Sequence, residues 1–416
     1  MNGKDSGAAD DADNTDSRPG RVKDSRAAGD ALFTPRFFLM CSYSFTVFMS
    51  AFQLLPTAPF HILALGGTGS EAGLFLGLLT YASAVSAPIT GALGDRLGKR
   101  RVLIVASLAI TSFSLLYAVA PSFQVILWLV LVHGVFWSGL LSSSSAYVID
   151  IVPKSRRAEG LGYAGFASIL AVAVAPWIGL WVFDHGGWTL LCLEMAGLNL
   201  LMAFIAWRLP PDTRREMPPL SLRPSDLVEW RIVIGAVTLF LYSFSYGGIT
   251  SFVAIYADHV GVTPRALYFT IFSLAIVATR PFLGRYADRV GHARVIVPCL
   301  SMMVLGIAVL VFASTRMTFA LSAMLFGVGF GSAYPIFVAH LMHHVPDHRR
   351  GATFGALIGA FDTGIGTGSI SVGWLSEHYG FGRAFAVAGA LALLSIPYFL
   401  FMEKRQWTTS ALAPPA

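Results

Sequence analysis

The sequence predicts an all-α integral membrane protein with twelve transmembrane helices, arranged as two pseudo-symmetric six-helix bundles. Of its 416 residues, 55% are hydrophobic and only 12% are charged, whereas a typical soluble domain carries about 25% charged residues. Long uncharged runs match the ~20 apolar residues that a membrane-spanning helix needs. The second half of the chain also repeats motifs of the first half at a constant offset of 193 residues. Such a fixed period indicates one structural unit that is present twice.

The apolar runs define twelve expected spans, six in each half of the chain. They cover 36–64, 71–94, 102–120, 123–150, 158–183 and 187–207, and then 231–258, 266–287, 295–313, 317–344, 351–376 and 381–402. We therefore expect an N-terminal bundle at 34–207, a cytoplasmic linker at 208–230, a C-terminal bundle at 231–405 and a C-terminal tail at 406–416. Residues 1–33 are polar and lack the apolar segment of a signal peptide, so we expect a disordered cytoplasmic tail there.

The placement of positive charge predicts how the chain sits in the membrane. Of the 29 Lys and Arg residues, 25 fall on the side that holds both termini, and only Arg265, Arg316 and Arg383 fall on the other side. By the positive-inside rule, both termini are then cytoplasmic and the protein is a multi-pass protein of the cell inner (cytoplasmic) membrane. The pI of 9.3 therefore reflects topology, and we expect the lipid bilayer, not nucleic acid, as the partner of these charges.

The repeat is clearest in a glycine-rich, charged turn between two apolar runs. In the first half it holds Gly91, Asp95, Arg96, Gly98 and Arg101, and in the second half Gly284, Asp288, Arg289, Gly291 and Arg294. This G-x-x-x-D-R-x-G-x-x-R pattern resembles the signature of the major facilitator superfamily of transporters. The resemblance covers roughly residues 34–405 and is greatest to the drug/proton antiporter and arabinose-efflux-type permease branch.

The resemblance implies that this turn acts as a latch between the two halves. Asp95 would face the start of the helix near Gly351, where the positive end of a helix dipole stabilises a carboxylate. By pseudosymmetry, Asp288 would face the helix start near Ala158. The arginines of both turns would pair with these carboxylates or with lipid phosphates, although they could also serve only to set the topology.

A second family feature lies in the span at 158–183, which resembles the antiporter motif of exporters. Gly162, Ala175, Pro176 and Gly179 fit this motif, but two of its glycines are replaced by alanine. The small residues still allow close helix packing, and Pro176 still bends the helix. Many proton-driven exporters of the family also carry an arginine four residues before the glycine that is Gly134 here, and this chain has Val130 instead.

Ionisable residues within the spans are the candidates for proton coupling, because a charge inside the membrane usually faces a cavity or a partner. Asp362 lies ~16 Å into its helix by the helical rise and is flanked by glycines, which makes it the first candidate. His133 lies near mid-membrane and belongs to the residue type that titrates near neutral pH, but it could equally be a buried neutral residue. Glu194 is the third candidate, with a packing role as the alternative.

The expected substrate cavity is lined by polar and aromatic residues of paired helices in the two halves, where transporters commonly bind their substrates. The candidates are Phe45, Phe48, Phe52, Gln53, Tyr242, Tyr246 and Arg280. The phenylalanines could instead pack against lipid or neighbouring helices. Arg280 could instead reach the cytoplasmic interface or pair with Asp288.

These features predict a secondary active transporter that moves a small organic solute by alternating access, with protons as the coupling ion and efflux as the direction. The alternative is a facilitator or proton symporter that imports a small metabolite; a transport-inactive membrane sensor fits less well. The sequence has no phosphate-binding loop, no nucleophile paired with a base and no metal-ligand cluster. Cys41, Cys192 and Cys299 lie in spans without such spacing. We therefore expect a monomeric protein that is not an enzyme, with no catalytic residue, cofactor or metal.

Overall fold

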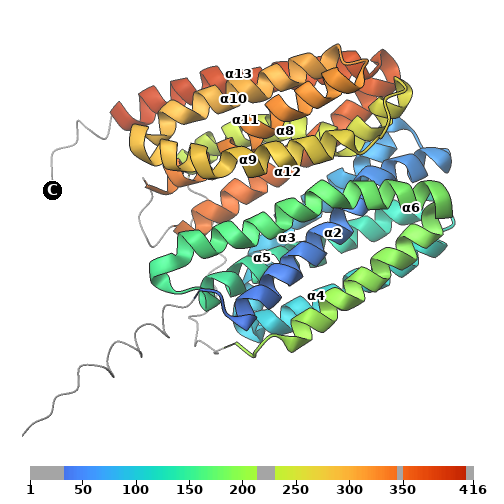
Figure 1. Cartoon of the computed structure of the whole chain (residues 1–416), viewed down its shortest axis with the longest axis horizontal. Coiled ribbons are helices and arrows are strands. Elements are labelled where there is room, and N and C mark those ends of the chain that lie inside the picture. Colours follow the sequence, from blue (N-terminus) through green and yellow to red (C-terminus); the bar gives the residue numbers. More distant parts are fainter. Residues whose placement is uncertain (1–31, 213–229, 344–349, 409–416) are drawn as a thin grey trace, which may run out of the picture.

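The structure is a computed structural model that describes residues 32–212, 230–343 and 350–408 (Figure 1). In this part of the chain the long elements are all α-helices. The first bundle contains α2 (Pro35–Ala64), α3 (Gly69–Leu97), α4 (Lys99–Val119), α5 (Phe123–Ile151), the short 3-10 turn η1 (Lys154–Arg156) and α6 (Arg157–Arg208). The second contains α8 (Trp230–His259), α9 (Leu267–Val290), α10 (His292–Val311), α11 (Arg316–His343), α12 (Arg350–Tyr379) and α13 (Phe381–Thr408). The expected tails and linker lie mostly outside the described residues, and the exact domain limits stay a prediction.

Helix α6 contains two of the predicted spans. Its 52 residues include Gly187, whose φ of 73° and ψ of −177° are not helical. Glycine adopts this positive φ readily because it has no Cβ. The chain reverses direction at this point, so the eleven long helices of the described residues form twelve segments. Ten of these helices are long and apolar enough to cross a membrane, and the predicted fold class is confirmed.

The two copies of the charged turn have the same backbone conformation. Gly98 ends α3 with φ 97° and ψ 131°, and Gly291 ends α9 with φ 96° and ψ 134°. In both copies the next helix begins at the following residue, so the glycine makes a sharp corner that a side chain would strain. The sequence repeat is therefore also a structural repeat.

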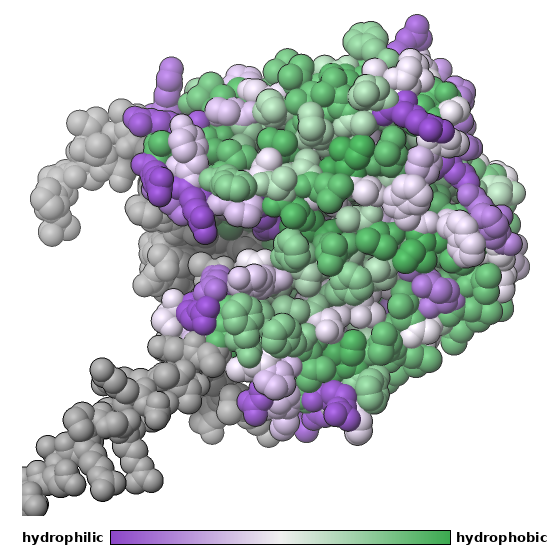
Figure 2. Space-filling model, viewed as in Figure 1, coloured by the Kyte–Doolittle hydropathy of each residue, from purple (hydrophilic) through white to green (hydrophobic). Residues whose placement is uncertain are grey.

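The two bundles lie side by side, and their helices run between two faces (Figure 1). We call the face with the turns at 98, 152–156 and 291 the terminal face, because α2 begins and α13 ends there. The opposite, distal face carries the turns at 65–68, 120–122, 260–266 and 312–315. A broad hydrophobic band lies between the two faces in the space-filling view (Figure 2).

The bundles are joined on the distal side, where α3 of the first bundle packs against α12 of the second. The Ser369 hydroxyl donates a hydrogen bond of 2.9 Å to the Gly73 carbonyl, and the Tyr81 and Thr367 hydroxyls are 2.9 Å apart. At the distal end of α3, the Gly69 amide donates a 3.0 Å hydrogen bond to the Glu377 carboxylate. This carboxylate therefore caps the N-terminus of a helix in the other bundle, a position where the helix dipole favours negative charge.

A second inter-bundle contact closes the distal face. Arg265, just before α9, forms an ion pair with Asp184 on α6, and its guanidinium lies 5.0 Å from the centre of the Phe60 ring on α2. Near it, the Trp177 indole donates a 2.6 Å hydrogen bond to the Thr270 hydroxyl.

The bundles separate on the terminal side. Among the described residues, the hydrogen bonds between α3 and α12 involve the distal parts of these helices and extend toward the terminal face only as far as Ser83 and Asp362. Val85 and Ile89, which follow on α3, have 78% and 60% of their surface exposed. The space-filling surface is hollowed between the bundles on this side (Figure 2). The structure is thus closed at the distal face and open at the terminal face.

Within the second bundle, α12 approaches α8 at backbone distance. A Cβ atom on Gly368 would meet the Phe244 carbonyl carbon at 2.6 Å, and one on Gly247 would meet that of Ile365 at 2.7 Å. Real Cβ atoms do not come this close, so the absence of side chains sets the spacing of these two helices.

This packing leads to a stability prediction for a pair of glycines on the same helix. We expect Gly368→Ala to destabilise the protein by about 1–3 kcal/mol, because the added methyl group overpacks a close helix contact. Gly359→Ala has open space around its Cβ and is expected to be neutral or to stabilise by up to ~1 kcal/mol through helix propensity. Thermal unfolding of both variants in detergent measures the difference; equal melting temperatures would contradict it.

Candidate substrate site

A cluster of stacked aromatic rings in the second bundle forms the core of the candidate site. The Phe330 ring on α11 stacks on Tyr242 and Tyr246 of α8, with centroid distances of 4.5 and 4.3 Å. The Tyr242 hydroxyl also donates a hydrogen bond to the Phe330 carbonyl. On the other side, the Phe361 ring of α12 lies 4.9 Å from the Tyr334 ring of α11 and 6.2 Å from that of Tyr242. Three helices of one bundle, α8, α11 and α12, therefore share a single aromatic surface.

Asp362 follows Phe361 and lies at the boundary between the two bundles. Its carboxyl group interacts with the Ser83 hydroxyl of α3 and with Tyr334. Ser83 comes just after the distal part of α3 that packs on α12, so Asp362 lies where the closed side meets the open side. The side chain is half-buried. Among the described residues, it has no basic partner.

Arg280 lies on α9, ten residues before the end of the helix at the terminal face. One of its guanidinium nitrogens would be 3.6 Å from a Cβ atom placed on Gly165 of α6, in the other bundle. Tyr242 is close enough to interact with it electrostatically. Asp288, the partner considered from the sequence, instead pairs with His292 at 3.4 Å. Arg280 is exposed and forms no ion pair with any described residue.

Gln53 and Glu194 form a separate pair inside the first bundle. The Gln53 side-chain amide on α2 donates a 3.2 Å hydrogen bond to a Glu194 carboxylate oxygen on α6. Gln53 is fully buried, and α6 passes so close that a Cβ on Gly179 would lie 2.8 Å from its Cα. The Gln53 amide oxygen and the other Glu194 carboxylate oxygen are buried without a hydrogen-bond partner among the described residues. The pair lies in the packing between α2 and α6, apart from the aromatic cluster of α8, α11 and α12.

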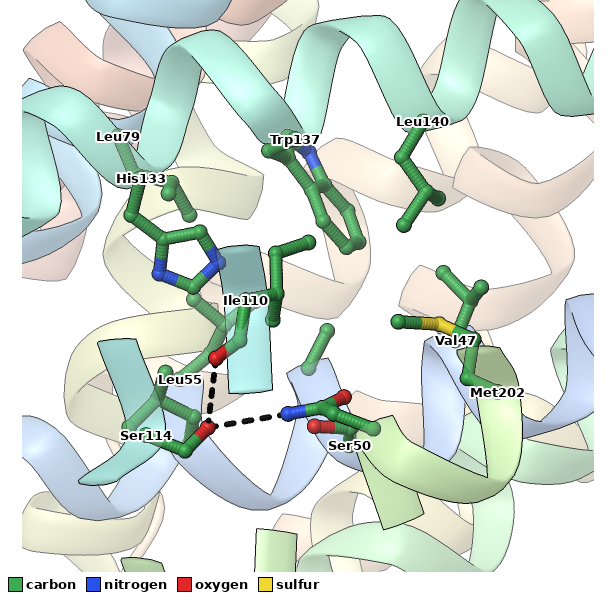
Figure 3. A pocket seen from close by; sticks show the side chains of 13 residues that line it. Val47, Ser50, Leu55, Leu79, Ile110, Ser114, His133, Trp137, Leu140 and Met202 are labelled. Carbon is green, nitrogen blue, oxygen red and sulfur yellow. Dashed lines mark hydrogen bonds between the residues drawn. The ribbon is translucent and has the colours of Figure 1, made fainter. Parts of the chain in front are cut away.

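His133 also lies within the first bundle, beside a small cavity (Figure 3). Its ring stacks on Phe113 of α4 at 5.4 Å, and its Nδ1 atom is 3.1 Å from the Tyr117 hydroxyl. The cavity of about 20 Å³ has room for a single water molecule. Asn199 and Ser114 lie on its other side, joined by a 3.0 Å hydrogen bond. This cavity is too small for an organic solute.

The other sequence candidates of the first bundle pack against neighbouring helices. Phe48 stacks on Phe52 at 6.1 Å and meets Trp137 of α5 at 6.3 Å, and Phe45 is partly buried. In the motif of α6, Ala175 is fully buried, Gly179 supports the close approach to α2, and Pro176 lies inside the helix. Gly162 has open space around it.

The latch residues lie at the open terminal face. Asp95 is exposed, and no described residue forms an ion pair with it. The side chains around Gly351 and Ala158, where we expected the partner helix starts, lie outside the described ones. The latch role of Asp95, Asp288 and the arginines beside them stays a prediction, and an open terminal face is the state in which such a latch would be released.

Sequence reasoning missed Phe330, Tyr334 and Ser83. The first two belong to a long apolar run in which neither spacing nor charge marks them out. Ser83 is one of many small polar residues in the spans. A signal for Tyr334 was present, since a phenolic hydroxyl at membrane depth needs a partner.

Two bundles of membrane-crossing helices, joined on one side and open on the other around a polar and aromatic site, define a polytopic membrane protein of the transporter class. A sequence profile described as Major Facilitator Superfamily matches residues 37–268 and again 235–413. The chain therefore belongs to the major facilitator superfamily, as the repeated turn predicts.

Relatives and solved structures agree with this assignment. The staphylopine export protein of Staphylococcus aureus is 23% identical over 82% of this chain and 89% of its own length. The multidrug resistance protein MdtG of Salmonella arizonae is 24% identical over 84% of this chain and 91% of its own length. The nucleoside transporter NupG has a TM-score of 0.72 at 14% identity and covers 90% of this chain and 100% of its own. The human organic anion transporter MFSD10 has a TM-score of 0.64 at 17% identity, over 88% and 100%.

Proposed function

We propose that this protein is a secondary active transporter that exports a small organic solute in exchange for protons. The observation that carries the proposal is the position of Asp362, an ionisable group between two bundles at the boundary of their closed and open sides. A group there contacts α3 in the distal-closed state and would lose that contact when the bundles rock. Protonation could therefore favour one state over the other, which is what coupling by population shift requires.

Export is supported by the relatives, because two proteins that match most of this chain are named as an exporter and a multidrug resistance protein. The distribution of Lys and Arg supports a cytoplasmic terminal face, so that the structure would be open toward the cytoplasm, where an exporter loads its solute. We further propose that the protein works as a monomer in the inner membrane, since each chain carries both bundles.

The test uses everted membrane vesicles from cells that overproduce the protein, with a panel of labelled organic solutes. We expect at least one solute to accumulate when the vesicle lumen is acidified and to stop accumulating when the proton gradient is collapsed by an ionophore. Vesicles with an empty vector are the control. Equilibration that ignores the gradient would identify a facilitator, and accumulation driven by protons moving in the same direction as the solute would identify an importing symporter; either result would overturn the proposed exchange.

A further inference from the structure

A positive charge lies between the two bundles, and no described residue forms an ion pair with it. The Arg280 guanidinium is exposed in the gap between α9 and α6, next to Gly165, whose missing side chain leaves it room. An arginine stays charged under all conditions relevant to proteins, and a charge at membrane depth normally has a partner or faces a water-filled cavity. Arg280 is thus a permanent binding position for a negative group.

A negative position lies at a similar depth. By the helical rise, Arg280 is ~15 Å and Asp362 ~18 Å from the terminal ends of their helices. Each side chain is close to one tyrosine of a neighbouring pair: Tyr242 interacts with Arg280, Tyr334 interacts with Asp362, and these two tyrosines interact with each other. The two charged groups are therefore neighbours of one aromatic surface, although they do not pair with each other.

The aromatic surface between them has rings that are still accessible. Tyr246, Tyr334 and Phe361 are half-buried, whereas Tyr242 and Phe330 are buried beneath them. Half-buried rings can stack on a flat or apolar part of a solute. The site therefore offers an anion-binding group, an apolar surface and a carboxyl group.

We propose that the transported solute is zwitterionic, with a carboxylate or similar anion that binds Arg280 and an ammonium or similar cation that binds Asp362, joined by an aromatic or apolar skeleton. This inference rests on the proposed proton exchange at Asp362. When the cation of the solute arrives, it takes the place of the exchangeable proton, and both charges of the site are then neutralised.

Solutes with a single charge fit the site less well. A cation without an acidic group would pair with Asp362 but leave the Arg280 guanidinium uncompensated and repelled. An anion without a basic group would pair with Arg280 but require Asp362 to keep its proton, so that solute and proton would bind together instead of exchanging. Only the zwitterion neutralises both groups and still displaces a proton.

The test is a binding assay on purified protein in detergent, which needs no gradient and no transport. We would use matched sets of probes that share one skeleton: phenylalanine, phenethylamine and 3-phenylpropanoate; tryptophan, tryptamine and indole-3-propanoate; and the dipeptides of both amino acids. Thermal stabilisation of the protein at increasing probe concentration gives the affinity. We expect stabilisation by zwitterionic members, and a roughly 10- to 100-fold weaker affinity of Arg280→Gln for them, as for the loss of a charged hydrogen bond. Arg280→Lys should recover part of the lost affinity.

Several outcomes would overturn the inference. Stabilisation only by amines, with an affinity that Arg280→Gln leaves unchanged or improves, would identify a cation site. Stabilisation only by carboxylates would identify an anion site. If no zwitterion stabilised the protein, the proposed zwitterionic solute would also be excluded. If zwitterions bind but transport does not depend on protons, the proposed proton exchange is wrong and the charge recognition stands. The proposed function and the zwitterion inference can therefore fail separately.

Discussion

Replacing Asp362 by asparagine is expected to reduce proton-driven accumulation of the solute strongly. Asparagine keeps the size of the side chain and its ability to interact with Ser83, but it cannot exchange a proton. If the carboxyl group couples the two processes with a typical free energy of 1–3 kcal/mol, accumulation in everted vesicles falls roughly 5- to 150-fold. Exchange of solute across the membrane without a gradient should continue, because that step needs only the rocking of the bundles.

The matched control is Asp150→Asn, the same chemical change at a half-exposed ion pair with Lys99 on the terminal face. Surface pairs of this kind contribute only about 0–1 kcal/mol, so this variant should accumulate solute like the wild type. Asp362→Glu should retain part of the proton dependence, because the carboxyl group is kept. Wild-type accumulation and an unchanged pH profile in Asp362→Asn would show that another group couples the protons.

The fold could be predicted from the sequence because its determinants are local. A span in lipid must satisfy its own backbone hydrogen bonds, so each long apolar run has to be a helix. The glycines that end such runs also act locally: Gly98 and Gly291 take the same positive φ in both halves. Even helix α6, which contains two expected spans, follows the expected division, since Gly187 marks the start of the expected span at 187–207.

The site could be predicted only in part, because it depends on which side of a helix each residue faces and on which helices meet. Gln53 and Glu194 are 141 residues apart, and no spacing rule places them in one hydrogen bond. The sequence placed Gln53 in the substrate cavity, whereas the structure packs it under Gly179. Phe330 and Tyr334 could not be singled out from the sequence, because an aromatic residue in an apolar span is common. Only the structure shows that a neighbouring helix stacks on them.

The difference between the two faces also explains why the latch and the distal contacts should not form together. In this conformation the distal face is held by Glu377 at the start of α3 and by the ion pair of Arg265 with Asp184, while Asp95 at the terminal face forms no ion pair with a described residue. A rocking motion that brings Asp95 to the start of α12 would pull α3 away from the distal half of α12. Glu377 would then cap the start of α3 in one state, and Asp95 would cap the start of α12 in the other.

Substituting Gly73 by leucine is therefore expected to shift this alternation strongly toward the state that is open at the distal face. A Cβ atom at this position would lie 2.8 Å from the Ser369 carbonyl carbon and 2.9 Å from the Ile370 Cα, so the leucine disfavours the contact between α3 and α12. Overpacking of about 1–3 kcal/mol would change the ratio of the two states roughly 5- to more than 100-fold. Once the distal face opens, the side chain has room.

The measurement is the distance between spin labels at Leu65 and Tyr379, exposed residues of the two bundles at the distal face, in protein whose three native cysteines are replaced by alanine. Gly73→Leu should lengthen the mean distance and slow turnover, because the distal-closed state is less populated. Gly197→Leu on α6, where the added side chain meets open space, should leave both unchanged. A wild-type distance together with wild-type turnover in Gly73→Leu would mean that the α3–α12 contact is not part of the transport cycle.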